Sequence, residues 1–304
     1  MPRSPSQPRP VPLIGSLLLG LLAGCGGDDP APGAGGASPD LRTVHPHFPV
    51  TVRDDEGRTV TLEHPPQRII ALVPSATEAL GALGLQELLV GRTDFDRDPE
   101  LAHLPSVGGG LEPSPERLIA LEPDLVIRFA AESDRVTPVH LDRARIPHLA
   151  IRPDRIRDIR RILRLLGGVT GHPDDARELV EAMDRELDRV ATQVRDAPRP
   201  RVAFLLGGDP PWIVGPGTFL HELLEVAGAR NAFQDLEGDY APVSVEEVVR
   251  REVELILALE GARVPDALSY LPLRRVPDRV QAPGHLVGES ARTLARVIHP
   301  ELVP

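Results

Sequence analysis

Apolar and polar positions first form a regular pattern near residue 50 of the chain. Residues 50–52 and 59–62 alternate between apolar and polar side chains, and the segment between them contains Gly57. Alternation on both sides of a glycine-containing turn is typical of a β-hairpin. We therefore expect a hairpin at the start of the folded region.

The run at residues 68–73, which is continuously apolar after Arg68, stops at Pro74 and Ser75. Such a run is typical of a strand that is buried on both faces. Ser75 followed three residues later by Glu78 matches a capping box, a side-chain pattern that opens helices. The sequence therefore predicts a buried strand that passes directly into a helix.

The short-strand pattern returns three times in the first half of the chain. The runs lie at residues 88–91, 124–127 and 148–151, with helical stretches near 114–121 and 135–144. Strands that alternate with helices form a parallel sheet covered on both faces. We expect an α/β lobe over this region.

Residues 173–197 show a different pattern, in which the apolar positions fall on one helical face. A helix of about 22 residues spans roughly 33 Å, which is enough to cross one lobe and enter another. An ordinary surface helix has the same periodicity, so the pattern alone leaves both interpretations open.

Strand and helix patterns alternate again after residue 198. Strands are expected at 202–206 and 253–258, and helices at 218–227 and 290–298. The predicted fold class is α/β, with two lobes bridged by a single long helix. The predicted boundaries are residues 46–172 for the N-terminal lobe, 173–197 for the bridging helix and 198–304 for the C-terminal lobe.

The N-terminus has the anatomy of a secretory signal, because Arg3 and Arg9 precede an apolar run at residues 11–22. This run is shorter than the about 20 residues that span a bilayer. It ends in Leu-Ala-Gly-Cys at residues 22–25, which resembles the bacterial lipoprotein cleavage box and implies lipid attachment to Cys25. A plain secretion signal with a chance cysteine, or a cysteine buried in the core, would also fit.

We therefore expect residues 1–24 to be a lipoprotein signal peptide and residues 25–45 to be a flexible tether, because the latter are rich in Gly, Pro, Ala and Ser. This predicts an exported protein held at the membrane through Cys25, in the periplasm or at the cell surface.

Composition narrows the function classes. The 304 residues carry a net charge of −11, and the arginines are interspersed with acids, so a nucleic-acid partner is not expected. The hydrophobic content of 41% is that of a globular protein. A single cysteine excludes an internal disulfide.

Several blocks of the chain together resemble the helical-backbone class of periplasmic binding proteins, which serves ABC importers of vitamin B12, ferric siderophores and haem. The blocks lie at residues 69–78, 90–99, 107–124, 209–233 and 243–248. Residues 93–96 and 209–212 look most like the vitamin B12 branch, whereas Gly108-Gly109-Gly110 departs from it.

The resemblance implies two Rossmann-like lobes bridged by one rigid helix, with the ligand in the cleft at the carboxyl ends of the strands. It implies a monomer that captures a small molecule, a corrinoid first and a ferric siderophore or haem as the alternative. The protein would deliver this cargo to an ABC importer permease, with no catalysis, cofactor or resident metal.

Aromatic side chains are rare in the chain, and the resemblance assigns three of them to the cleft. Trp212 and Tyr240 would contact the ligand from the second lobe and Phe95 from the first, with Asp94 or Asp96 accepting hydrogen bonds from ligand amides. The alternatives are an indole packed under its own loop and a solvated turn at residues 93–96.

Other candidate ligand-binding residues surround the predicted strand ends. Pro74 and Ser75 would point backbone N–H groups of a helix N-terminus toward the cleft, or Ser75 would only cap the helix. Gly109 would let backbone approach the ligand.

Arg128 and Phe129 follow a predicted strand, where Arg128 would bind a carboxylate or phosphate or form a surface salt bridge. His285 lies in a segment that echoes the family's pocket loop.

Glu116 and Glu246 match positions from which the family docks onto arginines of its permease. Both would also be favoured by the dipole of a helix N-terminus, and the two roles are compatible.

An exported enzyme is the main alternative from another class. The sequence has no GxSxG, P-loop or HExxH motif, so an enzyme would need an unrecognised constellation. The histidines are scattered without ligand spacing, which argues against direct metal binding, although His285 or Tyr240 could be an axial ligand of haem.

Overall fold

The structure is a computed structural model that describes residues 48–303. The predicted signal peptide, the lipid-attachment residue Cys25 and the predicted tether lie outside the described residues. Within residues 48–303, none of the helices combines the length and the apolar character that crossing a membrane requires.

The expected hairpin is present as β1 (Val50–Arg53) and β2 (Thr59–Leu62), which pair in antiparallel fashion. The carboxylate of Asp54 accepts hydrogen bonds from the backbone N–H groups of Glu56 and Arg58 at 3.1 and 2.8 Å, which fixes the turn. The same carboxylate accepts from the N–H of Ala150 at 3.1 Å and thereby ties the hairpin to the first sheet.

The first sheet has the strand order β4-β3-β5-β6, and all of its pairs are parallel. Its strands are β3 (Ile69–Ala71), β4 (Leu89–Gly91), β5 (Leu125–Phe129) and β6 (His148–Ile151). Its helices are α1 (Pro74–Ala82), α2 (Pro115–Ala120) and α3 (Thr137–Ala144), and the 3-10 turns are η1 (Gln86–Leu88) and η2 (Pro99–Leu101).

Alternate residues of β3, together with Leu72 directly after it, belong to two separate apolar clusters, as the pleat of a strand requires. Ile69 and Ala71 join the large core, whereas Ile70 and Leu72 join a smaller cluster that includes Leu118 of α2 and Leu141 of α3. The sheet is therefore covered on both faces, which explains the continuous apolar runs of its strands.

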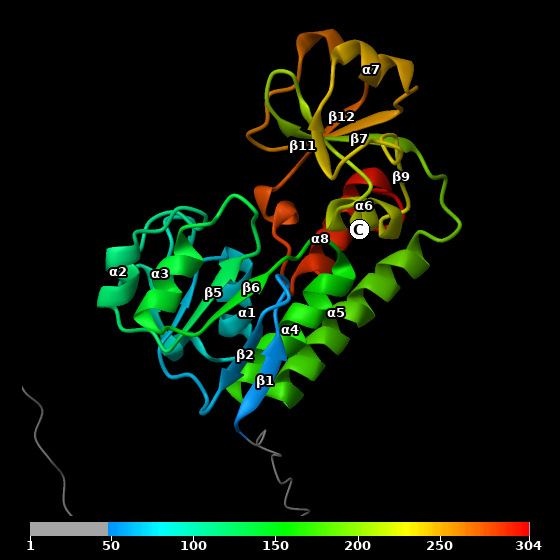
Figure 1. Ribbon diagram of the computed structural model, residues 1–304. Helices are drawn as coiled ribbons and strands as arrows, with labels where there is room; N and C mark the ends of the chain where they lie inside the picture. Colours follow the sequence, from blue (N-terminus) through cyan, green and yellow to red (C-terminus); the bar gives the residue numbers. More distant parts are fainter. Residues whose placement is uncertain (1–47, 304) are drawn as a thin grey trace, which may run out of the picture. The chain divides into compact units, whose positions relative to one another are not determined.

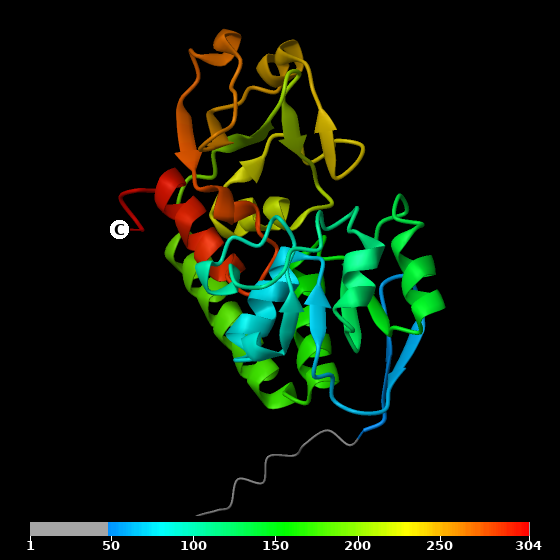
Figure 2. The ribbon, with the colours of Figure 1, turned by 90° about the vertical axis from the view of Figure 1, so that its left-hand side faces the viewer.

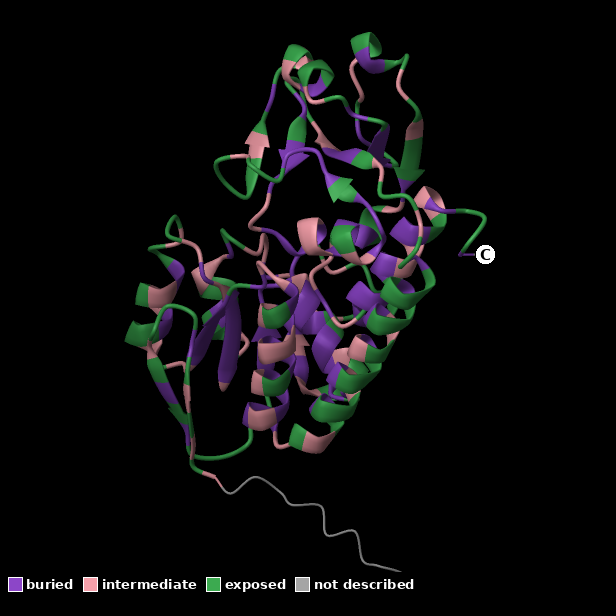
Figure 3. Ribbon diagram, turned by 90° about the vertical axis from the view of Figure 1, so that its right-hand side faces the viewer, coloured by how far each residue is buried: buried purple, intermediate pink, exposed green. Residues whose placement is uncertain are grey.

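Two long helices follow the first sheet, α4 (Ile156–Thr170) and α5 (Pro173–Gln193), and they pack against each other. A side chain at Gly167 would lie 2.3 Å from the Cβ atom of Ala176, so glycine permits this close packing. Helix α5 ends at Gln193, four residues before the predicted end. It also packs along the last helix, α8 (Val287–Ile298), as Figures 1 and 3 show.

The second sheet is mixed, with the order β10-β8-β7-β11-β12 and β9 paired to β7. Its strands are β7 (Arg201–Gly207), β8 (Trp212–Val214), β9 (Arg230–Asn231), β10 (Tyr240–Pro242), β11 (Leu255–Leu259) and β12 (Leu273–Val276). Helices α6 (Phe219–Val226) and α7 (Val245–Arg250) and the turns η3 (Asp266–Leu268) and η4 (Asp278–Gln281) complete this part.

The predicted fold class, two α/β lobes bridged by a long helix, is confirmed, and Figure 2 shows the two sheets with their helices from another side. The predicted capping box is wrong. Helix α1 begins at Pro74 and has no side-chain cap, and Ser75 is its second residue. Proline suits the first helical position because its missing N–H would have no partner there.

Candidate functional site

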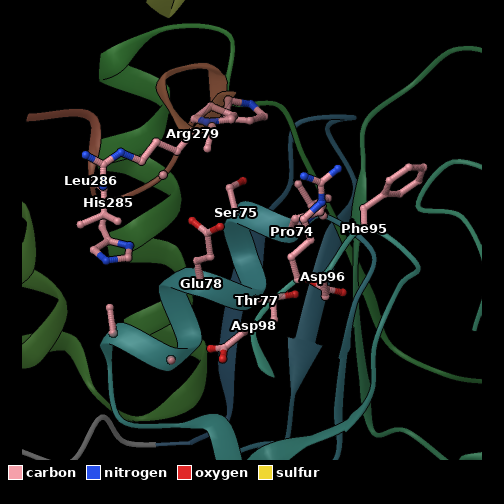
Figure 4. Close-up of a pocket in the computed structure, with 18 of the residues that line it drawn as sticks. Pro74, Ser75, Thr77, Glu78, Phe95, Asp96, Asp98, Arg279, His285 and Leu286 are labelled. Carbon is pink, nitrogen blue, oxygen red and sulfur yellow. The ribbon is translucent and has the colours of Figure 1, made fainter. Parts of the chain in front are cut away.

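The site lies at the carboxyl edge of the first sheet, where β3 passes into α1. A pocket of about 830 Å³ opens there, and three chain segments that are far apart in the sequence line it, as Figure 4 shows. They are residues 73–86, residues 95–101 and residues 278–290, together with Phe129 at the end of β5 and Pro153 after β6. This edge is where open α/β sheets generally bind their ligands.

The first turn of α1 forms one wall of the pocket. Gly284 of the last segment lies directly on this turn, since a Cβ atom there would be 3.6 Å from the Cβ atom of Ser75 and from Oε2 of Glu78. Thr77 is 5% exposed and lines the pocket, and no group among residues 48–303 hydrogen bonds with its hydroxyl. The wall therefore offers polar groups that the protein itself leaves unused.

Three carboxylates extend this wall. The carboxylate of Asp96 accepts hydrogen bonds from the N–H and the hydroxyl of Thr93 at 2.6 and 2.8 Å. Asp98 accepts one from the N–H of Glu100 at 2.9 Å and caps η2. Limited solvation of the Glu78 carboxyl, and then the charges of Asp96 and Asp98, raise the pKa of Glu78 above its usual value.

Arg279, His285 and Leu286 contribute the opposite wall, as Figure 4 shows. Burial lowers the pKa of His285, so the imidazole is neutral at pH 7. Its Nδ1 atom is buried and has no hydrogen-bond partner among the described residues.

Six of the sequence-predicted ligand-binding residues line this pocket: Pro74, Ser75, Phe95, Asp96, Phe129 and His285. Asp94 and Gly109 do not line it. The carboxylate of Asp94 instead accepts a hydrogen bond from the hydroxyl of Ser106, and Gly109 lies beside the ring of Phe95.

The predicted position of Arg128, past a strand end and facing the cleft, is wrong. Arg128 lies within β5, and its side chain is fully buried away from the pocket. Its two terminal nitrogens bind the carboxylate of Glu56, and its Nε donates to Nδ1 of His148 at 3.1 Å. A buried guanidinium needs such partners, and with these taken Arg128 is not available to a ligand.

Tyr240 lies in the edge strand of the second sheet and Trp212 in the strand beside it, and neither residue lines the pocket. Trp212 begins β8 instead of lying in a loop, and it pairs with Pro242 of β10, while Tyr240 pairs with Val214. This register places both rings on the same face of the two strands. They are 46% and 40% exposed, which is unusual for aromatic residues and leaves them free to contact a ligand.

The hydroxyl of Tyr240 differs from its ring in exposure to solvent. Although the ring is partly exposed, its hydroxyl is poorly solvated and hydrogen bonds with Thr218. Burial first, and then the carboxylates of Asp239 and Asp154, raise the pKa of Tyr240 to about 12. Asp154 directly follows the pocket-lining Pro153, so the charge of a residue next to the pocket acts on Tyr240.

Glu116 and Glu246 occupy equivalent places in two different helices. Each is exposed and is the second residue of its helix, α2 or α7, after an N-cap serine. Backbone N–H groups and the capping hydroxyl of Ser114 or Ser244 lower the pKa of each carboxyl, so both are ionised at neutral pH.

Sequence reasoning missed Thr77, Glu78, Asp98 and Arg279 as pocket residues. Glu78 was noticed only as half of a capping box, although the helical period that places Ser75 beside the cleft also brings Glu78 there. Nothing local indicates Arg279, because its segment reaches the pocket only through tertiary packing. Among residues 48–303, no group of three or more His, Cys, Asp and Glu side chains is arranged to hold a metal ion.

A family model described as periplasmic binding protein matches residues 69–269. The chain is 27% identical to an uncharacterised ABC transporter substrate-binding lipoprotein of Bacillus subtilis, covering 94% of this chain and 96% of the relative. It is 29% identical to a vitamin B12-binding protein of Pectobacterium carotovorum, over 63% of this chain and 71% of that protein. A cobalamin-binding protein of Halobacterium salinarum is also 29% identical, and the match covers 84% of this chain and 70% of that protein.

Solved structures share the fold. The vitamin B12-binding protein BtuF of Vibrio cholerae superposes with a TM-score of 0.66 at 21% identity, covering 77% of this chain and 97% of that one. A haem-binding protein of Roseiflexus gives a TM-score of 0.67 at 24% identity, and the match covers 77% of this chain and 98% of that one. The fold is thus common to binding proteins of different ligands and does not distinguish among them.

Proposed function

The chain belongs to the periplasmic binding protein family, the extracytoplasmic substrate-binding proteins of ABC transporters, and from this premise we propose that its cargo is a corrinoid of the vitamin B12 type. Membership of this family also makes it a binding protein for transport and not an enzyme. The finer assignment of the cargo rests on the chemistry of the pocket.

The observation that carries the proposal is the combination of aromatic faces and hydrogen-bond acceptors around one pocket. Phe95 and Phe129 present rings to it, and Asp96 presents a carboxylate beside the first turn of α1. A corrinoid is partly flat and edged with amides, so it needs ring faces for its plane and acceptors for its N–H groups. The pocket of about 830 Å³ would hold part of such a ligand, and the rest would extend toward Trp212 and Tyr240.

The relatives support the same cargo. Two proteins that are each 29% identical to this chain are named for vitamin B12 or cobalamin binding, and they come from a bacterium and an archaeon. The shared feature that we propose to extend to this chain is the binding of a corrinoid in the pocket.

A ferric siderophore is the second candidate, because the carboxylates of the pocket would also suit a hydroxamate that carries an ammonium group. Haem fits less well. Tyr240 does not line the pocket, which disfavours it as an axial ligand there. Within residues 48–303, His285 has no acceptor at Nδ1 of the kind that usually orients an axial histidine.

We further propose that the protein acts as a monomer that is lipid-anchored at Cys25. Its Bacillus subtilis relative is named a lipoprotein, which supports an anchor at the same kind of cysteine.

Docking to the permease would use Glu116 and Glu246. Each carboxylate is exposed and ionised. Three positions further along each helix lies an exposed aliphatic side chain: Ile119 is 39% exposed and Val249 is 48% exposed. A charge beside an apolar contact suits a protein interface, in which charge governs the orientation of encounter.

The first experiment is a calorimetric titration of residues 26–304 with cyanocobalamin. Sub-micromolar binding that is lost in Trp212→Ala supports a corrinoid receptor whose ligand reaches the second lobe. No heat at any concentration contradicts the corrinoid assignment and favours a siderophore or haem. A visible absorption band on the protein as purified would identify haem directly.

A further inference from the structure

The side chains that line the pocket carry more negative than positive charge. Five carboxylates and two guanidinium groups line it. The carboxylates belong to Glu78, Asp96, Asp98, Asp278 and Glu289, and the guanidinium groups to Arg97 and Arg279. His285 adds no positive charge because it is neutral at pH 7.

The carboxylates beside α1 keep acceptor atoms for a ligand. Thr93 occupies only Oδ2 of Asp96, and Glu100 occupies only Oδ1 of Asp98. Glu78 accepts no hydrogen bond and forms no ion pair within the part of the chain that the structure describes. Each of the three side chains therefore presents at least one oxygen that only a donor outside the protein can use.

Thr77 gives an independent indication that this wall receives a polar ligand. Its side chain is almost completely buried, the residue lines the pocket, and its hydroxyl has no hydrogen-bond partner in residues 48–303. Buried hydroxyl groups are normally satisfied, and an unsatisfied one at a pocket wall points to a partner that arrives with the ligand. A hydroxyl can donate to a ligand carbonyl oxygen or accept from a ligand N–H.

We infer that this pocket selects ligands whose polar edge carries amide or ammonium hydrogen-bond donors and rejects ligands edged with carboxylates, with Glu78 as the specificity-determining residue. The inference rests on the proposed function, in which this pocket receives the transported cargo. A primary amide would donate its N–H groups to Glu78 and accept from Thr77. A carboxylate in the same place would have no proton to donate and would face like charge.

The test uses four probes of defined charge in equilibrium titrations with residues 26–304. Cyanocobalamin is edged with neutral amides, and its monocarboxylate derivative replaces one amide by an anion. Ferrioxamine B is a ferric trihydroxamate with an ammonium group, and haemin carries two carboxylates. We expect the amide form of the corrinoid to bind about tenfold more tightly than the monocarboxylate, and ferrioxamine B more tightly than haemin.

Glu78→Gln is the deciding variant, because it keeps the size of the side chain and removes its charge. It should reduce the preference for the amide over the carboxylate to about threefold or less. Glu87→Gln is the matched control, since Glu87 is exposed nearby in η1 and does not line the pocket. The control should keep the preference of the unmodified protein.

The outcomes separate this inference from the proposed cargo. Equal binding of cyanocobalamin and its monocarboxylate overturns the selection and leaves the corrinoid assignment intact. Binding of ferrioxamine B without cyanocobalamin contradicts the corrinoid assignment and supports the selection. Preferential binding of haemin, no binding of any probe up to about 100 μM, or an unchanged preference in Glu78→Gln overturns the selection.

Discussion

Arg128, in the middle of the first sheet, binds with both terminal nitrogens to the carboxylate of Glu56 in the β1–β2 turn. The guanidinium is fully buried, whereas the carboxylate is 32% exposed. The pair connects strand β5 to a hairpin that lies 72 residues earlier in the chain. The hairpin is therefore attached to the sheet by a charge that has no access to water.

Glu56→Gln should lower the free energy of unfolding by about 2–4 kcal/mol, because it leaves the buried charge of Arg128 without its counter-ion. The lower part of this range allows for water that reaches the exposed part of the site. Urea denaturation of the variant measures the loss. Glu63→Gln, on the exposed segment just after the same hairpin, is the control and should change stability little. Equal stability of the two variants would contradict this account of the pair.

Stability should also fall as the pH decreases, in two steps. Burial, and then the nearby charges of Arg58 and Arg128, lower the pKa of His148, so the unfolded chain takes up a proton below about pH 6.5 that the folded chain refuses. The stabilisation is present above that pH and is lost as the pH falls toward the lowered pKa. The hydrogen bonds from Arg128 lower the pKa of Glu56, which adds a second loss below about pH 4.5.

The first step can be assigned with His148→Asn, whose amide oxygen can still accept a hydrogen bond from Arg128. The difference between the unfolding free energies at pH 7.5 and at pH 5.5 should be smaller in this variant than in the unmodified protein. The reduction should be up to about 1.4 kcal/mol for each pH unit over which His148 titrates. His103→Asn removes an exposed histidine and should keep the pH dependence of the unmodified protein. The same pH dependence in both variants would show that His148 is not the group that titrates.

The fold was largely predictable because each element of the first sheet has a local signal. Residues 69–72 carry apolar side chains at every position, and the structure divides them between two cores. Helix α4 was missed although its sequence carries a local signal: its apolar positions have helical period, and arginine is a favourable helix residue. Strands β8 and β10 have three residues each, which is too short to show an alternation.

The site was predictable where a single segment or the resemblance to the family indicates a residue. Pro74 and Ser75 were found because a strand passes into a helix there. The wall that carries Arg279 reaches the pocket through packing of the last helix, about 200 residues further along the chain. On this wall only His285 was predicted, from the resemblance of its segment to the family's pocket loop. The error at Arg128 has the same origin, because its partner Glu56 lies on a distant turn.

Thr77→Val should keep or raise the stability of the free protein by up to about 1 kcal/mol, because the buried hydroxyl has no partner to lose among residues 48–303. The same variant should lower the affinity for the tightest-binding ligand by about threefold to tenfold, which is the effect of losing one hydrogen bond. Thermal unfolding and titration measure the two effects.

Thr170→Val is the matched comparison, because Thr170 is also a buried helical threonine but its hydroxyl donates to the carbonyl oxygen of Leu166 at 2.7 Å. This variant should be destabilised and should bind ligand normally. A destabilised Thr77→Val with unchanged ligand affinity would mean that the hydroxyl serves the fold and not the ligand.

Glu116→Arg combined with Glu246→Arg should abolish transport while leaving ligand affinity unchanged. Both carboxylates are exposed, and neither lines the pocket, so their loss changes only the charge that the two lobes present to a partner. Reversal of both charges would place like charge against permease arginines and should weaken docking by at least about tenfold. Ligand-dependent ATP hydrolysis by the importer, reconstituted with each variant, measures the effect.

Glu178→Arg combined with Glu237→Arg makes the same change in net charge at exposed positions elsewhere, on α5 and after β9. This control separates docking from the general effect of charge, because it should stimulate the importer as the unmodified protein does. Glu116→Arg alone and Glu246→Arg alone should each stimulate ATP hydrolysis less than the unmodified protein and more than the double variant, since one remaining carboxylate still orients the complex. Normal stimulation by the Glu116→Arg and Glu246→Arg double variant, with ligand binding intact, would exclude both glutamates from the docking surface.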